Sequence, residues 1–399
     1  MFPIQTEIHP FSCRLCVVAW CVRLRRFVLS LVDITQRFKG TKLALCFPVL
    51  TIVSQQASYA DDPLVWNQLP SLPDAEGFAG PFVGTDNGAL VVAGGANFPD
   101  KMPWEGGTKV WYDHVFVLDS PNGSWRPADK LPRPLGYGVS ISTSDGIFCL
   151  GGSDASRHYV DCFRLQWRDG KLKTTPLPAF PKPCANFSGA MLGDTIYVAG
   201  GLESPTATST LKTFWSLDLT DSNAKWQELE PWPGQARMLA TAAVHENTFF
   251  LCSGTDLKPG TDGKPSRTYL RDAYSFQRGR GWKKIADMPR AAVASPTPAP
   301  SLGQSTFLIV SGDDGSLIDF QPPEKHPGFP KSILAYDTIT DTWQSVGEGP
   351  VGHVTTSIVY WRDRFVIPSG EIRPGKRSPA VWSFNATLRG SLKSETAKE

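Results

Sequence analysis

Metal-binding and redox motifs are scarce in this chain of 399 residues once its first 60 residues are set aside. Four of the eight cysteines lie beyond residue 60, and no two of them form a CxxC pair. The histidines of that region are scattered along it: His114, His158, His245, His326 and His353. A structural metal therefore has no visible ligand set, and we expect neither a metal nor a cofactor. A copper radical oxidase, which would need clustered His and Tyr ligands, is disfavoured for the same reason.

The chain also lacks a strong excess of charge of either sign. Its 40 Lys and Arg residues against 38 Asp and Glu residues give a formal net charge of +2. Seven of the basic residues but only two of the acidic ones lie in residues 1–60, so the remainder holds 33 basic and 36 acidic side chains, a net charge of −3. No stripe of Lys and Arg marks the remainder, which disfavours a nucleic-acid partner.

The first 60 residues are organised differently from the rest. Two lysines precede an apolar stretch over residues 43–53, and Ser-Tyr-Ala follows at residues 58–60, which is the pattern of a cleaved signal peptide. We therefore predict a periplasmic or secreted protein. Residues 13–32 are apolar but interrupted by four arginines, which disfavours a spanning helix. We predict that residues 1–38 are an over-long gene start, and that the mature protein carries neither this segment nor a membrane span.

A glycine pair, or a Ser-Gly variant of it, closes an apolar run six times along the chain. The pairs are Gly94-Gly95, Gly151-Gly152, Gly200-Gly201, Ser253-Gly254, Ser311-Gly312 and Ser369-Gly370. Successive pairs are 49 to 58 residues apart. A repeat of this length suits a four-stranded unit and indicates a radial or linear array.

Each repeat carries further strand signals. In the second repeat, residues 138–142 and 147–150 have the pattern of two strands joined by a turn at Asp145-Gly146. A third strand follows the glycine pair, and in four repeats a Trp then precedes a proline signal: Trp125, Trp226, Trp282 and Trp343. This pattern resembles kelch repeats, whose units are propeller blades, across residues 62–385. We predict an all-β fold, a six-bladed kelch-type β-propeller, in preference to a β-sandwich.

The sixth repeat ends without a fourth strand. After the third strand at residues 380–384 the chain has only a polar tail, residues 391–399. Residues 65–70 have the pattern of a fourth strand with no partners before it, so we expect this N-terminal segment to complete the last blade and close the ring. The propeller is predicted over residues 61–390, after the 1–60 leader.

The cysteines of the predicted propeller suit a packing role. Cys149 and Cys252 occupy the same apolar strand position in two repeats, which is the usual place of a buried, inert thiol. Export permits a disulfide between Cys149 and Cys162, and the spacing alone leaves that question open.

In a propeller, the start of the first strand and the end of the second strand of every blade lie on one face. The residues expected at the strand starts are Glu76, Arg133, Asn186, Arg237, Arg290 and His353. Those expected after the second strands are Asn97, Asp154, Glu203, Asp256, Asp313, Asp314 and Glu371. Several arginines beside carboxylates suit a small anionic, polyhydroxylated ligand. Solvated loop charges without a ligand are the alternative.

Two stretches go beyond the general kelch pattern, residues 94–111 and the sequence Gly-Glu-x-x-Pro-Gly-x-Arg at residues 370–377. Both resemble the bacterial N-acetylneuraminate epimerases, or sialate mutarotases, and the order of blades resembles the cyclically permuted branch of that family. The resemblance implies an isomerase that interconverts the anomers of N-acetylneuraminate or a related keto sugar acid. It implies Glu371 and Arg377 as the catalytic residues.

The chemistry agrees with that assignment. Exchange of anomers requires the anomeric hydroxyl to lose a proton while the ring oxygen gains one, and a single carboxylate can serve as base and then as acid. A nearby arginine would bind the sugar carboxylate and favour the ionised form of Glu371. Asn97, Arg133 and Arg237 are assigned to substrate binding.

The chain departs from its relatives in places. Ser378-Pro379 follows the arginine loop, the second repeat lacks its Trp, and Ser153-Asp154 stands where a glutamate often follows the glycine pair. These departures leave the identity of the sugar acid open. A non-catalytic carbohydrate-binding propeller and a protein-interaction kelch module are the alternative functions.

Overall fold

The computed structural model describes residues 64–260 and 264–386. These residues fall in one compact unit, Ser58–Glu399. The predicted signal peptide, the predicted gene-start segment and the polar tail lie outside the described residues. Across the described part of the chain no helix is long and apolar enough to cross a membrane.

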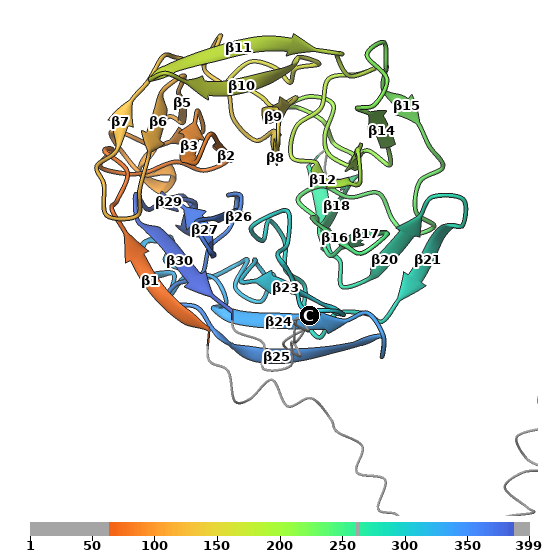
Figure 1. Cartoon of the computed structure of the whole chain (residues 1–399). Coiled ribbons are helices and arrows are strands. Elements are labelled where there is room, and N and C mark those ends of the chain that lie inside the picture. The colour runs from red at the N-terminus through yellow and green to blue at the C-terminus, as the bar shows by residue number, and fades with distance from the viewer. Residues whose placement is uncertain (1–63, 261–263, 387–399) are drawn as a thin grey trace, which may run out of the picture. The chain divides into compact units, whose positions relative to one another are not determined.

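Six four-stranded antiparallel sheets are arranged around a common axis (Figure 1), which confirms the predicted six-bladed propeller. From the axis outwards, blade 1 consists of β2 (Phe82–Asp86), β3 (Ala89–Ala93), β6 (Val115–Leu118) and β7 (Arg126–Pro127). Blade 2 consists of β8 (Val139–Thr143), β9 (Gly146–Leu150), β10 (Cys162–Arg168) and β11 (Lys171–Leu177). Blade 3 consists of β12 (Ser188–Leu192), β13 (Thr195–Ala199), β14 (Phe214–Asp218) and β15 (Gln227–Glu228). Blade 4 consists of β16 (Thr241–His245), β17 (Thr248–Cys252), β20 (Ala273–Gln277) and β21 (Gly281–Ile285). Blade 5 consists of β22 (Ser301–Leu302), β23 (Thr306–Val310), β24 (Ser332–Asp337) and β25 (Thr342–Glu348).

The sixth blade is completed by the N-terminal strand. Its order is β26 (Val359–Trp361), β27 (Arg364–Pro368), β30 (Val381–Asn385) and β1 (Val65–Leu69). Trp66 lies opposite Phe384 in the ladder, with their ring centroids 4.7 Å apart. This pairing removes the free edge that the last sheet would otherwise present, as the sequence predicted.

A closed ring of six backbone hydrogen bonds surrounds the axis. It contains one residue from each blade, and each donates its N–H to the carbonyl of the corresponding residue in the preceding blade at 2.6–2.8 Å. The six residues are Gly80, Tyr137, Asn186, Leu239, Ala294 and Thr355, all with a left-handed φ of 53–64°. Five of them are not glycine, and such residues adopt this conformation only where surrounding contacts impose it. The ring, which we call the axial ring, joins all six blades.

The glycine pairs lie where neighbouring blades pack closely against each other. In blades 1 to 3 the first glycine has a left-handed φ, and an added Cβ would lie 2.2–2.6 Å from a carbonyl oxygen at the start of the next blade. In the other blades a serine takes that position, and its hydroxyl accepts a hydrogen bond from a backbone N–H of the next blade at 2.7–2.8 Å. These serines are Ser253, Ser311 and Ser369. Both versions fasten each blade to its neighbour.

The tryptophans of the repeat make the outer connection between blades. Each donates its indole N–H to a carbonyl that follows the outer strand of the preceding blade, at 2.7–3.0 Å. The four donors are Trp125, Trp226, Trp282 and Trp343. The repeated Trp therefore marks the position of an inter-blade hydrogen bond.

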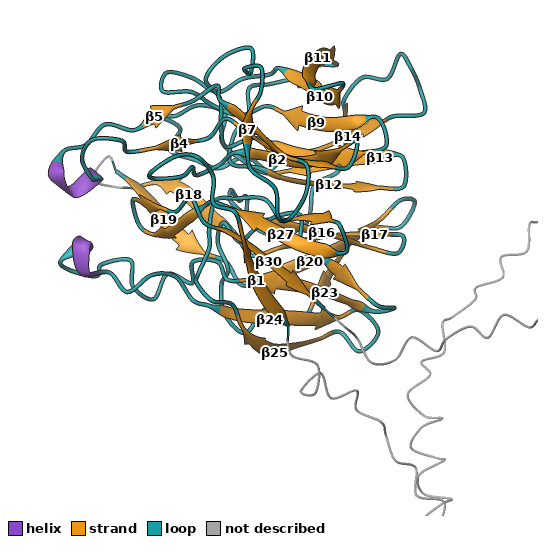
Figure 2. Cartoon of the chain, turned by 60° about the vertical axis from the view of Figure 1, so that its left-hand side comes forward, coloured by secondary structure: helices purple, strands orange, loops and turns teal. Residues whose placement is uncertain are grey.

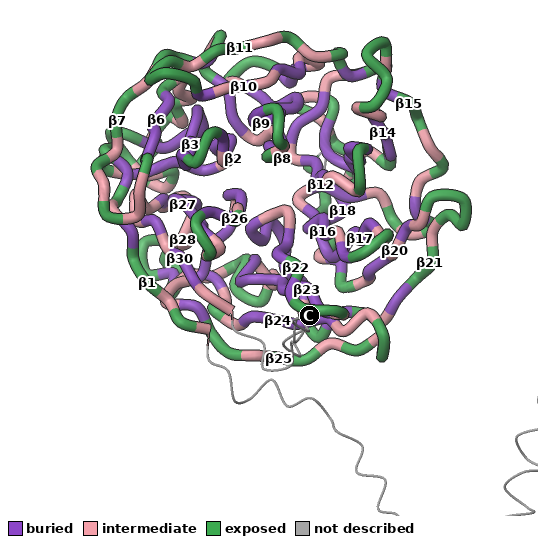
Figure 3. Tube along the Cα trace, in the orientation of Figure 1, coloured by how far each residue is buried: buried purple, intermediate pink, exposed green. Residues whose placement is uncertain are grey.

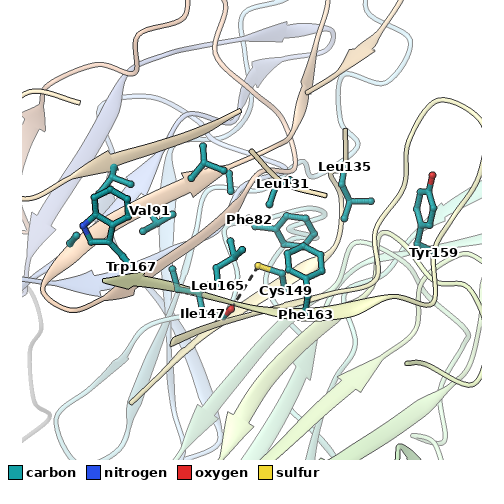
Figure 4. Close-up of a cluster of buried hydrophobic side chains, with 14 residues drawn as sticks. Phe82, Val91, Leu131, Leu135, Ile147, Cys149, Tyr159, Phe163, Leu165 and Trp167 are labelled. Carbon is teal, nitrogen blue, oxygen red and sulfur yellow. Dashed lines mark hydrogen bonds between the residues drawn. The ribbon is translucent and has the colours of Figure 1, made fainter. Parts of the chain in front are cut away.

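The hydrophobic core lies between neighbouring blades. Figure 4 shows one such layer, in which Phe82 and Val91 of blade 1 face Ile147, Phe163 and Trp167 of blade 2. Because the core is distributed between sheets in this way, the loops at each end of the strands are free to form the functional surface.

All four cysteines of the described region are free thiols buried in this core. Cys162 lies opposite Leu150, whereas Cys149 lies opposite Phe163. The two thiols belong to different hydrophobic clusters on opposite sides of blade 2, so the disulfide that the spacing left open is not formed. Burial raises the pKa of Cys162 to about 12 and raises that of Cys149 as well. Both thiols are therefore protonated at neutral pH.

Candidate functional site

One face of the propeller carries three two-stranded hairpins. They are β4–β5 (Ala96–Asn97 and Val110–Trp111), β18–β19 (Thr255–Pro259 and Pro265–Tyr269) and β28–β29 (Glu371–Arg373 and Lys376–Arg377). Each follows the second strand of its blade. Figure 2 shows β4, β5, β18 and β19 on the same side as two 3-10 segments, η2 (Pro103–Glu105) and η3 (Pro323–Lys325). We call this side the hairpin face.

Strand starts and strand ends meet on this face in every blade, as the propeller geometry predicts. Each blade has one isolated antiparallel bridge between the residue before its axial-ring residue and a residue directly after its glycine pair. In blade 6 that bridge joins Val354 to Glu371. Glu371 is therefore held at the inner side of the hairpin face.

The β28–β29 hairpin folds Glu371 and Arg377 onto each other. The two residues are directly opposite in the ladder, and Nη2 of Arg377 lies 3.3 Å from Oε2 of Glu371. Gly375, with a φ of 79° in the turn, donates its N–H to Oε1 of Glu371 at 2.8 Å, and its carbonyl accepts from Nη1 of Arg377 at 2.6 Å. The side chain of Glu371 is 16% exposed and that of Arg377 only 3%. The carboxylate therefore has a defined orientation with one open side.

The two stretches singled out in the sequence lie against each other. The guanidinium of Arg377 stacks over the ring of Phe98, with Cζ 4.7 Å from the ring centroid. A Cβ on Gly375 would lie 2.8 Å from Cγ of Pro103 and 3.2 Å from the Trp104 ring, so only glycine fits there. The segment of blade 1 that contains Phe98, Pro103 and Trp104 thus forms one wall of the Glu371 site.

An aromatic group continues that wall toward the axis. The ammonium of Lys109 lies 5.9 Å from the ring centroid of Phe98, 5.4 Å from that of Trp111 and 5.2 Å from that of Tyr137. Tyr137 belongs to the axial ring, whose residues line a hollow of about 50 Å³ that opens to solvent. None of these four side chains was predicted as a site residue. Phe98, Lys109 and Trp111 lie in the distinctive stretch 94–111, whereas Tyr137 lies outside it and had no signal in the sequence.

Asn97, a predicted substrate ligand, is buried and tied to its own surroundings. Its amide nitrogen donates to the carbonyl of Gly77 at 2.9 Å and to Asp74 at 3.3 Å, and its amide oxygen accepts from the hydroxyl of Tyr112 at 2.8 Å. These contacts support the base of the β4–β5 hairpin. The role of Asn97 in binding a ligand stays a prediction.

The arginines predicted to line the mouth do not gather there. Arg237 has no exposed side-chain surface; it donates to Ser253 O and Asp272 Oδ2 at 2.8 and 2.9 Å and lies between the rings of Trp232 and Tyr274. Arg290 likewise donates to backbone carbonyls of its own blade, and burial lowers its pKa. In blades 4 and 5 these arginines therefore hold the start of the first strand to the rest of the sheet.

Arg133 is more open than the other two. It pairs with Asp161 at 2.9 Å, lies over the ring of Tyr159 at 4.5 Å, and its side chain is 37% exposed. Its proposed contact with substrate stays a prediction, whereas the burial of Arg237 favours a structural role for that residue. Only Glu371 and Arg377 among the five predicted site residues contact each other directly.

Most of the carboxylates expected after the other second strands have partners of their own. Burial alone would raise the pKa of Asp154, but hydrogen bonds from the hydroxyl of Tyr159 and from Ser156 outweigh that effect and lower it to about 2. Asp256 accepts from a threonine hydroxyl of blade 3 and pairs with an exposed lysine of its own hairpin, and Asp313 accepts from a tyrosine hydroxyl of the β18–β19 hairpin of blade 4. Glu371 differs from them because its cationic partner is itself almost fully buried.

Comparison with known proteins finds a family match over part of the chain. Residues 49–174 match the family model described as N-acetylneuraminate epimerase. The N-acetylneuraminate epimerase of Salmonella enteritidis PT4 is 39% identical over 138 residues, which cover 31% of this chain and 35% of the relative. That of Yersinia pestis (strain Pestoides F) is 37% identical over 125 residues, covering 27% and 31%.

The chain thus spans about a third of the length of these curated epimerases. The family match covers blades 1 and 2, with Asn97, Lys109 and Arg133, whereas Glu371 and Arg377 lie outside it. The solved structure of YjhT resembles this chain with a TM-score of 0.57 at 15% identity, over 78% of this chain and 95% of YjhT, which shows a common fold. The likeness of the sixth blade to the epimerases and the permuted order of blades stay predictions.

His353, the strand-start residue of blade 6, gives a testable pH dependence. Its side chain is buried and neither ring nitrogen has a hydrogen-bond partner among the described residues. Burial lowers its pKa from 6.5 to about 4, which a nearby backbone group of Val351 opposes only in part. Between these two values the unfolded chain binds a proton that the folded protein does not. This histidine's contribution to stability is therefore complete above pH 6.5 and is lost as the pH falls toward 4, by on the order of 3 kcal/mol.

We expect His353→Phe to remove that loss. Urea unfolding of the variant and of the wild type at pH 7 and pH 4.5 measures the difference, and the histidines elsewhere serve as the common background. A pH dependence that is the same in both proteins would contradict the assignment.

Proposed function

We propose that this protein is an exported mutarotase that interconverts the α and β anomers of N-acetylneuraminate or a related keto sugar acid by acid/base catalysis. The observation that carries the proposal is the Glu371–Arg377 pair, in which a mostly buried carboxylate with one open side is oriented by Gly375 and Arg377. The match of residues 49–174 to the epimerase family model supports the same reaction, because Phe98 in this part of the chain lies against the Glu371–Arg377 pair.

The proposed reaction opens and recloses the sugar ring. The Glu371 carboxylate takes the proton of the anomeric hydroxyl, the bond between the anomeric carbon and the ring oxygen breaks, and the protonated Glu371 then gives that proton to the ring oxygen. Rotation about the bond next to the resulting ketone presents its other face, and the reverse proton transfers close the ring as the second anomer. No electrons leave the substrate, so the reaction needs no oxidant or reductant.

The surroundings of Glu371 favour this role. Oε1 of the carboxylate accepts from the Gly375 N–H and Oε2 faces the guanidinium of Arg377, so both oxygens are held in a fixed orientation. Phe98 and Trp104 shield the pair on one side and strengthen these electrostatic contacts by excluding water. We also propose that the protein is exported, so that it meets its substrate outside the cytoplasm.

The test is an anomer-exchange assay. The purified protein is added to an equilibrium mixture of N-acetylneuraminate anomers, and exchange between their resolved C3 proton signals is followed by saturation-transfer NMR. We expect catalytic amounts to accelerate exchange well above the buffer rate. A panel of other keto sugar acids identifies the preferred substrate. If no member of the panel exchanges faster with protein than without it, the proposed function is wrong.

A further inference from the structure

We propose that Lys109, rather than Arg377, binds the carboxylate of the acidic sugar, with the indole N–H of Trp111 and the hydroxyl of Tyr137 as further polar contacts. This inference rests on the proposed function and specifies how that site recognises its substrate. It differs from the expectation drawn from the sequence, in which the arginine of the β28–β29 hairpin held the sugar acid.

Arg377 is poorly placed to contact an incoming anion. Its side chain is 3% exposed, its Nη1 donates to Gly375 O, its Nη2 faces Glu371, and one face of its guanidinium is covered by Phe98. Its Nε has no hydrogen-bond partner among the described residues, but it is buried within this arrangement and offers almost no surface to a ligand. A second carboxylate would have to displace Glu371 from the only ion pair that Arg377 makes among the described residues. Arg377 is therefore a positioning residue for the Glu371 carboxylate.

Lys109 has the opposite properties. It is half-buried, and within residues 64–260 and 264–386 its ammonium contacts three aromatic rings but makes no ion pair or hydrogen bond with protein atoms. By contrast, Lys376 and Lys258 of the same face are paired with Glu76 and Asp256 at 2.7 and 3.1 Å. The aromatic faces attract the ammonium but leave its three N–H donors unused. A cation held in place with free donors suits an anionic ligand.

Two polar atoms of the same aromatic group independently indicate a ligand. Nε1 of Trp111 and the hydroxyl oxygen of Tyr137 are buried, and neither has a hydrogen-bond partner among the described residues. A buried polar group without a partner is costly, and a ligand that supplies the partner would remove that cost. Both rings lie against Lys109 and pack on each other at 6.3 Å, so the three groups form one subsite.

This subsite adjoins the Glu371 pair. Phe98 contacts Arg377 and Lys109 with the same ring, at 4.7 and 5.9 Å from its centroid. Tyr137 belongs to the axial ring and lines the central hollow, whereas Glu371 bridges to the residue before Thr355 of that ring. A sugar acid with its carboxylate on Lys109 would thus lie between the axial hollow and Glu371, and the flexible stem of lysine allows its charge to follow the ligand.

The experiment compares Lys109→Met with Lys109→Arg in the NMR exchange assay, using free N-acetylneuraminate and its uncharged methyl ester. Lys130, an exposed lysine paired with Asp113, supplies the matched control Lys130→Met. We expect Lys109→Met to raise KM for the free acid roughly tenfold or more while kcat changes little, because a charge-assisted contact to the ground state and the transition state alike is lost. KM for the ester should not change, and Lys109→Arg should restore most of the affinity for the acid.

The outcomes separate this inference from the proposed function. An unchanged KM for the acid in a folded Lys109→Met protein, or an equal loss for acid and ester, overturns the lysine assignment while exchange by the wild type upholds the function. If the wild type binds the acid without accelerating exchange, the function is wrong, and calorimetric Kd values of wild type and Lys109→Met still decide the lysine's role. Absence of acid binding by the wild type overturns both.

Discussion

Replacement of Glu371 by Gln is expected to abolish most of the acceleration of anomer exchange. Loss of a positioned general base lowers kcat by about 10²–10⁴-fold. The amide keeps the size of the carboxylate and can still accept the N–H of Gly375, so the β28–β29 hairpin should stay folded. The saturation-transfer rate and the calorimetric affinity for the sugar acid are measured on the same preparation, and we expect the rate to fall while binding persists.

The matched control is Glu203→Gln. Glu203 lies two residues after the glycine pair of blade 3, close to the position that Glu371 takes in blade 6, but it is exposed. The Glu203→Gln variant should therefore exchange anomers at the wild-type rate. Full activity of Glu371→Gln would end the assignment of this carboxylate as the base and would leave a binding propeller as the better description.

Arg237→Met is expected to destabilise the protein severely, by about 3–5 kcal/mol, because it leaves Asp272 and the carbonyl of Ser253 without their buried partner. Wild-type Arg237 is fully buried, so KM for the sugar acid should stay within about twofold at a temperature where the variant is folded. Urea unfolding measures the first quantity and the exchange assay the second.

Arg133→Met provides the comparison. Its ion pair with Asp161 is exposed, so its loss should cost less than about 1 kcal/mol. A stable Arg237→Met protein with a large increase in KM would show that this arginine turns toward the ligand, contrary to the contacts described above. A rise in KM for Arg133→Met alone would instead retain the predicted substrate role of that residue.

Much of the fold could be predicted because the repeat consists of residues that determine the local conformation of the backbone. Glycine pairs stand where the backbone takes left-handed φ values and where a neighbouring carbonyl leaves no room for Cβ, as at Gly94 and Gly200. The unpaired strand pattern at residues 65–70 likewise identified the partner of β30. The hairpin that joins Glu371 to Arg377 was predictable for the same reason, since Pro374-Gly375 between them makes a turn.

The direction of long side chains could not be predicted in this way. Arg237 and Arg377 both stand on the hairpin side of their blades, but the first extends into its own blade toward Asp272 and the second lies over Phe98. A guanidinium on a flexible stem can reach either a ligand or a carbonyl several residues away, and the choice depends on which buried acceptors lack a donor. The sequence does not show which buried acceptors lack a donor.

By itself, the sequence determined the number of blades and the seam where β1 closes the ring, because both follow from strand patterns repeated at a regular interval. The resemblance of residues 370–377 to the epimerases implied the carboxylate and the arginine, and the structure joins them in one hairpin. Only the tertiary structure decided which cation is left unpaired beside that carboxylate. Lys109, Trp111 and Tyr137 come from different strands and loops, and they form one subsite only because the closed axial ring brings neighbouring blades together. Contacts of that kind depend on the whole propeller, since side-chain packing between blades is settled only once all six are in place.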